Sequence, residues 1–311
     1  MTGYLISASG ERWVLPVLLQ WEITRTDGEP CGSAEIRFRF EPARLDVLKS
    51  AVRFYLEEDG KRAFTGVVDE FSAVCGADGR LVTLTGRSLA GLLMDSELRA
   101  AQYEVLTLED AIRLFVLPCG VERVEADAMQ PVEHFSTQTG TTCWQAICGY
   151  CRHAANVQPR FLADGTLLLK AERGAVWKLG DENGWTEAEY RFCRCGIIGQ
   201  QVITAAGNDL ETAENAALVS LGGGCRKVTL RQSPTMRATW KSARQRVEES
   251  LRGALTLTVT VPGFSAAEPG DTVEVSLDGA GITGSFRLRS RTDRCGRNGR
   301  QTVLELEGAL V

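Results

Sequence analysis

The chain has 311 residues, enough for two or three domains rather than one. Hydrophobic residues make up 44% of it and charged residues 24%, which is an ordinary globular composition. The net charge of −5 at pH 7 argues against a nucleic-acid-binding protein, because such proteins carry a basic excess.

The N-terminal residues 1–7 lack the basic start and long apolar core of a signal peptide, and no apolar run approaches the roughly 20 residues of a membrane span. We therefore expect synthesis in a cytoplasm, retention there unless another machine exports the chain, and no membrane insertion. In a long chain without a secretion signal, cysteines are expected to be reduced and to act as small buried hydrophobes. The chain has ten, irregularly spaced: Cys31, Cys75, Cys119, Cys143, Cys148, Cys151, Cys193, Cys195, Cys225 and Cys295.

The N-terminal part, residues 1–95, is predicted to be a small β-barrel or sandwich. Apolar and polar residues alternate with the period of a strand. Asp-Gly pairs at Asp27, Asp59 and Asp78 supply the turns. A short helix is expected within 42–50. The predicted strands are 17–25, 33–41, 52–58, 64–74 and 80–86.

The middle part, residues 96–180, is predicted to be a helical α/β domain. One helix is expected within 106–120, with Thr107 as its N-cap and Pro118 and Gly120 at its end. A second is expected within 141–156, and its apolar face is Trp144, Cys148, Cys151 and Ala155. Residues 158–172 are expected to form a hairpin around Asp164-Gly165.

The remainder is predicted to be β-rich, with residues 181–253 as a connecting region and 254–311 as a C-terminal β-domain. One or two strands are expected in 188–207, and a mobile, glycine-rich loop in 208–224. An amphipathic helix is expected within 233–253, with Trp240, Ala243, Val247 and Leu251 as its stripe and Gly253 after it. The last four predicted strands are 255–263, 271–279, 284–292 and 300–308. The fold class is thus mainly β with an α/β middle.

Gly86-Arg87-Ser88 stands where a predicted strand meets a helix, a place where phosphate loops occur. A P-loop needs Gly-x-x-x-x-Gly-Lys-Ser/Thr, so the segment is too short for one. We expect Gly86 to end the strand and Ser88 to cap the helix. The run Gly222-Gly223-Gly224 lacks the strand and helix of a dinucleotide site, and a flexible joint is expected there.

The strongest metal-like cluster is Cys148-x-x-Cys151-x-His153, which Cys193-x-Cys195 would have to complete. Zinc requires four converging ligands. Cys148 and Cys151 also lie on the apolar helix face, however, and we favour buried thiols over a metal site.

No catalytic constellation is apparent in the sequence. The two histidines are His134 and His153, and a nucleophilic site would have to use one of them with a residue such as Cys119, Cys143 or Cys148. No nucleophile elbow or HExxH motif is present. The 40 acidic residues offer many carboxylate pairs and promote none. No catalytic, cofactor-binding or metal-binding residue is predicted.

Residues 64–97 resemble the N-terminal domain of contractile-tail baseplate hub proteins, a family that includes the hubs of phage Mu and of PBSX-like prophage tails. In that family a β-barrel strand ends in Gly-Arg-Ser and enters a helix, which corresponds here to Gly86, Arg87, Ser88, Leu92 and Leu93. The resemblance continues through 107–121, 140–169 and the closing strands of 268–308. Residues 208–224 match nothing in the family, and the cysteine content is unusual for it.

The resemblance implies a structural protein without catalytic residues, the baseplate hub of a contractile phage tail or tailocin. By this resemblance the protein is expected to form a homotrimer, in which each chain carries two tube-like β-barrel domains flanking a helical α/β domain. Three chains make a pseudo-sixfold ring that joins the sixfold tail tube to the threefold spike. Implied partners are the tail tube protein, the central spike protein, the tape-measure protein and other baseplate proteins. The implied location is the tail tip or baseplate of the particle, after synthesis in the cytoplasm of a bacterial host.

Two further expectations accompany this interpretation. The bore should not be basic, because a channel that lets DNA pass should not hold phosphates, and no stable nucleic-acid binding is expected.

The alternative function is a tail-associated cell-wall hydrolase, which would need a cleft with a catalytic constellation. A glycan-binding β-module would need exposed aromatic side chains, and aromatic residues are only 7% of the chain.

Residues 52–86 and 272–308 share a series of turn motifs. Each has Asp-Gly (Asp59, Asp278), then Thr-Gly (Thr65, Thr283), then Cys-Gly-x-x-Gly-Arg (Cys75, Cys295). Chance sharing of common turn motifs is one explanation. We favour a duplicated β-domain, whose two copies would superpose and be related by about 60° around a trimer axis.

Overall fold

The computed structural model describes most of the chain. The described residues are 1–27, 31–41, 44–77, 79–171, 174–205, 208–216, 218, 226–231, 236–238, 240–263, 267–297 and 299–308. Cys225, the 222–224 glycine run, Gly28 and Asp78 lie outside them. Within the described residues, no helix is both long enough and apolar enough to traverse a bilayer.

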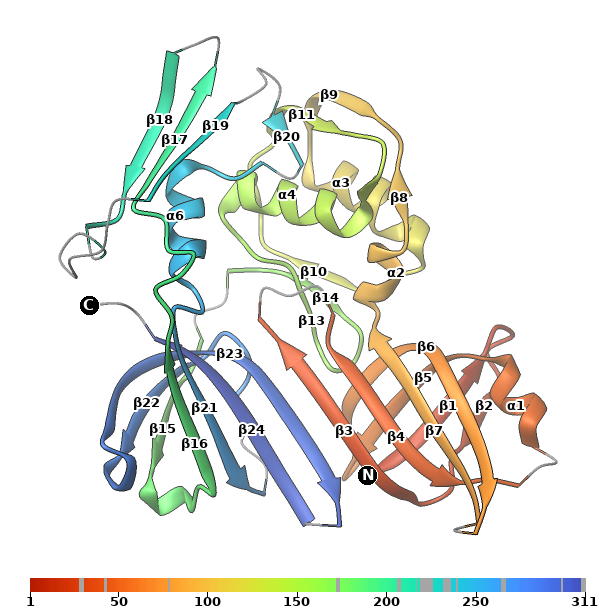
Figure 1. Ribbon diagram of the computed structural model, residues 1–311. Coiled ribbons are helices and arrows are strands. Elements are labelled where there is room, and N and C mark those ends of the chain that lie inside the picture. The colour runs from red at the N-terminus through yellow and green to blue at the C-terminus, as the bar shows by residue number, and fades with distance from the viewer. Residues whose placement is uncertain are drawn as a thin grey trace.

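The fold is mainly β, as predicted, and its largest unit is a 13-stranded sheet across the lower part of Figure 1. The strand order is β16-β21-β24-β23-β3-β4-β7-β6-β5-β1-β2, and β22 joins β23 to β15. The helix α1 spans Leu45–Ser50. The N-terminal strands are β1 (Thr2–Ser7), β2 (Arg12–Val14), β3 (Leu18–Thr26), β4 (Ser33–Arg39), β5 (Ala51–Glu58), β6 (Lys61–Gly76) and β7 (Gly79–Ser88). The C-terminal strands are β15 (Val176–Gly180), β16 (Glu187–Phe192), β21 (Leu255–Pro262), β22 (Thr272–Leu277), β23 (Ile282–Gly296) and β24 (Gly299–Gly308), with short 3-10 helices at Asp181–Asn183 and Asp278–Ala280.

β15 and β16 belong to the C-terminal part of this sheet. β15 pairs with β22 in parallel, and β16 pairs with β21 antiparallel. Residues 176–192 were predicted to lie in the middle and connecting regions instead, because their partner strands lie up to about a hundred residues later and leave no local signal. Separate cores fill the N-terminal and C-terminal halves of the sheet.

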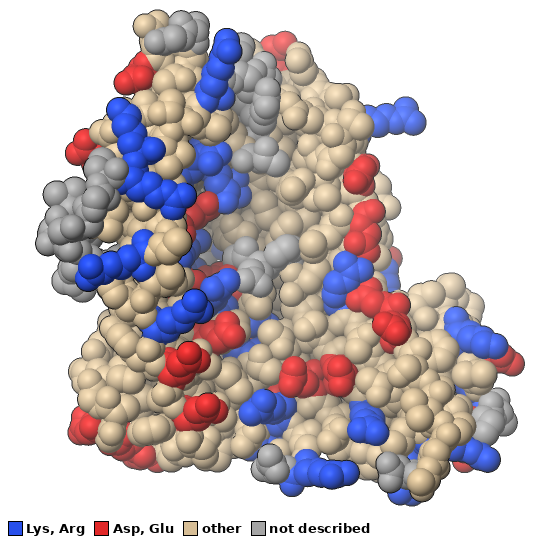
Figure 2. All heavy atoms as spheres, in the orientation of Figure 1, with Lys and Arg blue, Asp and Glu red and all other residues tan. Residues whose placement is uncertain are grey.

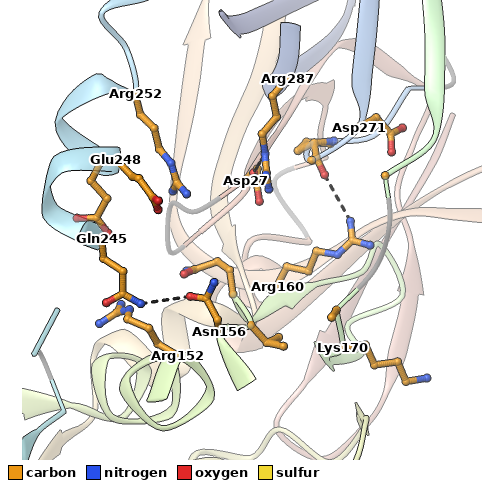
Figure 3. Close-up of a pocket in the computed structure, with 17 residues that line it drawn as sticks. Asp27, Arg152, Asn156, Arg160, Lys170, Gln245, Glu248, Arg252, Asp271 and Arg287 are labelled. Atoms are coloured by element: carbon orange, nitrogen blue, oxygen red, sulfur yellow. Dashed lines mark hydrogen bonds and ion pairs between the residues drawn. The ribbon is translucent and has the colours of Figure 1, made fainter. Parts of the chain in front are cut away.

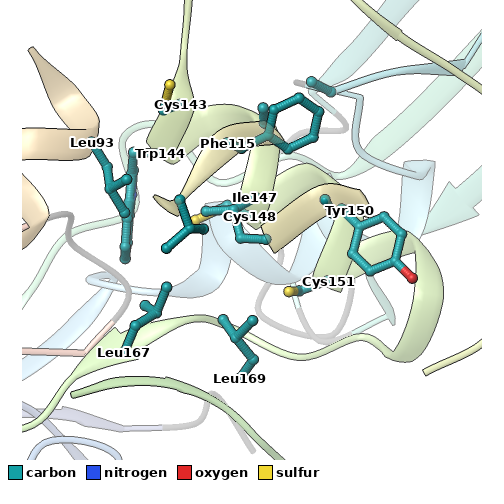
Figure 4. Close-up of a cluster of buried hydrophobic side chains, with 14 of the residues drawn as sticks. Leu93, Phe115, Cys143, Trp144, Ile147, Cys148, Tyr150, Cys151, Leu167 and Leu169 are labelled. Carbon is teal, nitrogen blue, oxygen red and sulfur yellow. The ribbon is translucent and has the colours of Figure 1, made fainter. Parts of the chain in front are cut away.

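The middle part lies above the sheet and has its own core (Figure 4). Both predicted helices are present. Thr107 caps the start of α3 by accepting a hydrogen bond from the Asp110 N–H at 3.2 Å, and Thr142 and Gln145 form a capping box at the start of α4. Ala155, expected on the buried face of α4, is exposed at its last turn. The elements are α2 (Ala90–Met94), β8 (Glu97–Leu98), β9 (Ala101–Leu106), α3 (Leu108–Phe115), a 3-10 helix (Leu117–Cys119), β10 (Val124–Ala126), β11 (Val132–Thr137), β12 (Thr141–Thr142), α4 (Cys143–Ala155), β13 (Arg160–Phe161) and β14 (Leu167–Leu169).

A small three-stranded sheet and helix α6 complete the fold at the upper left of Figure 1. The prediction of a loop over 208–224 is wrong for its first part, because Asn208–Glu214 form β18, which pairs with β17. That strand is polar and largely exposed, so it lacks the apolar alternation by which strands are recognised. On α6 the predicted residues Ala243 and Val247 are buried, whereas Trp240 precedes the helix. The elements are β17 (Gln200–Ala205), β18 (Asn208–Glu214), β19 (Lys227–Arg231), β20 (Met236–Arg237), which pairs with β11, and α6 (Ala243–Leu251).

The β6–β7 and β23–β24 hairpins have the same register. Adding 220 to each residue number turns one series of Cα partners into the other, from Gly66↔Ser88 and Phe286↔Gly308 to Gly76↔Gly79 and Gly296↔Gly299. Each hairpin also has its β-bulge at the same place, where Asp69 and Arg289 are the extra residues. The Thr-Gly motifs do not correspond, because the register places Gly66 level with Phe286 rather than with Gly284.

The correspondence extends across the neighbouring strands. β4 pairs with β7 as β21 pairs with β24, and β3 pairs with β4 as β16 pairs with β21. β3, β4, β5, β6 and β7 thus occupy the same positions as β16, β21, β22, β23 and β24, in the same chain order. We call this arrangement the repeated five-strand unit. Beyond it the halves differ, since β1 is antiparallel to β5 and β15 is parallel to β22.

Candidate functional site: the polar face and open edges of the sheet

One face of the 13-stranded sheet packs on the two β cores, and the other is polar and continuous across the junction between the halves. The pairing places Gln301, Arg294, Glu22, Glu35 and Thr85 in one row across five strands of the polar face. Figure 2 shows charged side chains of both signs interspersed over the lower part of the molecule, where this sheet lies. This row holds two glutamates and one arginine, and the described residues of this face form no basic tract of the kind that binds phosphates.

The predicted strand-to-helix junction is a tightly packed corner. β7 continues through Gly86 to Ser88, and the residue at the start of α2 is Leu89, without a side-chain cap, so both expectations for this segment are wrong. A Cβ on Gly86 would lie 2.0 Å from the carbonyl oxygen of Val67. Glycine is required here by the close approach of β6, not by the end of a strand.

Arg87 links three elements at this corner. Its guanidinium donates to both carboxylate oxygens of Asp69, each at 2.8 Å, and to Asp95 at 2.8 and 3.0 Å. These bonds lower the pKa of Asp95 and raise that of Arg87. In the second copy of the five-strand unit, Glu307 and Arg289 hold the equivalent positions and form an ion pair at 3.5 Å with the charges exchanged. The guanidinium is therefore occupied by carboxylates rather than open to a phosphate.

The cysteines singled out in the sequence lie in the core of the middle part. Cys148 and Cys151 on α4 are buried beside Trp144, Leu167 and Leu169 (Figure 4). Burial raises the pKa of Cys148 to about 12 and raises that of Cys151 further. Among the described residues no three Cys, His, Asp or Glu side chains converge as a metal would require.

Cys143 and Cys148, two of the candidate nucleophiles, are not activated. Burial raises the pKa of Cys143 to about 12, with a further contribution from Cys119, whereas nucleophilic cysteines have lowered pKa values. His134, on β11, is exposed, and its Nδ1 lies 3.5 Å from a carboxylate oxygen of Glu104. Raised thiol pKa values are the opposite of what a catalytic Cys–His pair requires.

A cleft of about 340 Å³ lies where α4, α6 and the two halves of the sheet approach one another (Figure 3), in the hollow at the centre of Figure 2. Most of its charged groups have a partner, either within the cleft or beside it. Arg287 donates to Asp27 at 2.7 Å, and Asp271 accepts the Ala175 N–H at 2.8 Å and the Trp177 indole N–H at 2.7 Å. These contacts connect parts of the chain, as structural bridges do.

Several strand edges of the large sheet lack a partner among the described strands: those of β2 and β15, which pair with one strand each, and two longer ones on β6 and β16. The second half of β6, residues 70–75, pairs with β7 on one side only, because β5 pairs with β6 only up to Val67. β16 pairs with β21 only and ends the sheet. Apolar side chains are exposed at both edges, with Val74 61% and Tyr190 52% accessible. Unpaired edges of this length are sites where another strand can add. These edges were not predicted, because strand pairing is not visible in local sequence patterns.

The comparison with solved structures agrees with the sequence resemblance. The tail protein from Neisseria meningitidis MC58 superposes with a TM-score of 0.74 at 20% identity, over 99% of this chain and 96% of its own. The 43 kDa tail protein of prophage MuSo2 from Shewanella oneidensis gives 0.73 at 16% identity, over 98% and 97%. The E. coli c3393 protein, a component of the type VI secretion system with structural similarity to the T4 bacteriophage tail proteins gp27 and gp5, gives 0.55 at 11% identity, over 94% and 73%.

No family model matches the chain, and no curated protein sequence matches it. The structural likeness covers almost all of this chain and of both of these tail proteins. The chain therefore has the fold of these tail proteins, and the predicted likeness to tail baseplate proteins is confirmed at the level of the fold.

Proposed function

We propose that the chain is a structural component of a contractile phage tail or tailocin, the homotrimeric hub of the baseplate. The observation that carries this proposal is the full-length likeness to tail proteins, together with the repeated five-strand unit. The protein acts as an adaptor between the sixfold tail tube and the threefold spike. It binds the tube protein, the spike protein, the tape-measure protein and other baseplate proteins, and is made in the host cytoplasm before assembly at the tail tip.

The repeat supports the adaptor role because it addresses a mismatch of symmetry. A threefold ring of single domains offers three equivalent surfaces, whereas a sixfold tube needs six. Two copies of the five-strand unit in each of three chains supply six similar tube-like domains, with the helical α/β part between them in sequence. The polar sheet face lines the bore, and its mixed charges let a polyanion pass without retention.

Light scattering tests the oligomeric state of the purified chain, alone and with the spike protein. A trimer of the 33.9 kDa chain has a mass of about 102 kDa. A monomer in both samples would refute the hub assignment. Images of purified particles, averaged with threefold symmetry at the tip, would then show whether the ring lies between tube and spike.

We propose no enzymatic role. The raised pKa values of Cys143 and Cys148 are opposite to those of a nucleophile, and most charged groups of the cleft have partners. Cleavage of purified cell walls by the isolated protein would contradict this assignment and favour the hydrolase alternative.

A further inference from the structure

The two copies of the five-strand unit are joined within the chain by a pair of strands. The second half of β23 pairs antiparallel with β3, from Ser290↔Thr26 to Cys295↔Trp21. This junction buries side chains from both strands. Ile23 is 1% accessible and Asp293 is 4% accessible.

Both strands of this junction have counterparts elsewhere in the chain. The counterpart of β23 is β6, and the register places Ser290 level with Glu70 and Cys295 level with Cys75. The counterpart of β3 is β16, and the pairing with β4 and β21 places Ile23 level with Tyr190. These counterparts are the two open edges described above. At Ala73, the counterpart of Asp293, the edge is exposed.

We propose that the open edge of β6 pairs with the open edge of β16 in a second copy of this chain, in the register of the internal junction. Because β6 is the counterpart of β23 and β16 is the counterpart of β3, the residue pairs of the internal junction specify the residue pairs of this one. Cys75 then lies opposite Ala188 of the neighbouring copy, Ala73 opposite Tyr190 and Glu70 opposite Cys193. The proposal depends on the hub assignment only for the number of copies in the ring.

The side-chain pattern provides an independent check on this register. In antiparallel strands, directly opposed residues point to the same face. The proposed pairs place Phe71 opposite Phe192 and Ala73 opposite Tyr190, all on the face that carries the β cores. A slip of one residue would instead bring a charged side chain of β16, such as Glu189 or Arg191, level with this apolar set.

The β23–β3 junction within the chain and the proposed β6–β16 junction between chains differ in their chemistry. Within the chain, Arg25 donates to Asp293 at 2.9 Å across the junction. Between copies, the positions equivalent to Arg25 and Asp293 hold Phe192 and Ala73, which are apolar. Pairing would cover Tyr190, now 52% accessible, as β23 covers Ile23. Burial of aromatic area supplies the favourable free energy of association that a junction between separate chains needs.

The occupant is a second copy because the two edges complement each other and lie at different places on one chain. A contact between unlike surfaces of identical chains is heterologous, and it builds a ring when the rotation closes. In Figure 1 β16 lies at the left of the sheet and β6 at the right, so neighbours can add on both sides.

A single substitution tests the register. In Ala188→Cys the introduced thiol should face native Cys75 of the next copy, close enough for a disulfide between opposed strand residues. The full-length variant is oxidised, separated on a non-reducing gel, and the linked peptides are identified by mass spectrometry. Glu189→Cys is the matched control, since its side chain points to the other face, and Ala188→Cys with Cys75→Ser removes the partner thiol.

We expect a link between position 188 and Cys75 that is absent from both controls, in a ladder of species that ends at three chains. The same link in a ladder that continues past three would uphold the junction and overturn the trimer. A mass of about 102 kDa by light scattering without this link would overturn the junction and leave the hub assignment standing. A monomer without the link would overturn both.

Discussion

Asp293 is the charged centre of the junction between the two halves of the sheet, and its removal should be costly. Its carboxylate accepts hydrogen bonds from Arg25 at 2.9 Å, from Arg291 at 2.8 and 2.9 Å and from Thr302 at 2.9 Å. Arg291 and Asp293 are both buried. Asp293→Ala would remove the carboxylate that both Arg25 and Arg291 contact, and the Arg291 guanidinium is buried.

Removing one partner of a buried ion pair costs about 3–5 kcal/mol, because the remaining charge stays buried without compensation. We therefore expect Asp293→Ala to lower the free energy of unfolding by about 3–5 kcal/mol, measured by urea unfolding at pH 7 with an unchanged m-value. Arg244→Ala is the control, because it removes an exposed ion pair with Glu248 and should cost about 0.5 kcal/mol. A loss below about 1 kcal/mol for Asp293→Ala would refute the view that this carboxylate holds the junction.

Three further predictions concern single side chains. Gly86→Ala should destabilise the protein by about 3 kcal/mol or more, because its Cβ would meet the Val67 carbonyl oxygen at 2.0 Å, whereas Gly76→Ala has open space and should change the urea midpoint little. Thr142→Ala should cost about 1 kcal/mol through loss of the α4 cap, seen as a lower melting temperature, and Thr142→Ser should restore most of it. The folded pKa of Cys148 is raised to about 12 against roughly 8.5 for an unfolded thiol, so its stabilising contribution is complete below the unfolded pKa and is lost as pH rises from about 9 to 12. Cys148→Ala should flatten that part of the stability profile, and an unchanged profile would contradict the burial argument.

The elements that sequence analysis located correctly are those with local signals. The strands around Cys75 and Cys295 alternate between a core face and a polar face, and their turns contain glycine where the backbone needs it. Gly79 and Gly299, for example, have φ of +96° and +80°. Thr107 was correctly predicted as the cap of α3, because a cap acts within one turn of its own helix. Thr142, the cap of α4, lies within the predicted helical range 141–156 but was not singled out.

The features that were missed depend on partners distant in the chain. Gly86 is required by β6 and by the Phe54 ring, neither of which is adjacent to it in sequence. The ion pairs of Arg87 use Asp69, which is the extra residue of a bulge, and a bulge has no sequence signature of its own. The polar strand β18 is held by pairing rather than by a buried face.

The open edge of β16 has to meet two opposing requirements before assembly. An exposed apolar edge strand invites pairing with any other strand, and proteins counter this with charged side chains along the edge. β16 carries Glu187, Glu189 and Arg191 on one face, alternating with Ala188, Tyr190 and Phe192 on the other. A partner in the proposed register meets the aromatic face with apolar residues and leaves the charges at the polar surface. A partner shifted by one residue would bury those charges, which costs several kcal/mol per unpaired ion. The alternation of charged and apolar side chains along β16 therefore has two effects. It discourages pairing of the free edge with other strands, and it selects the register in which the edge pairs with β6.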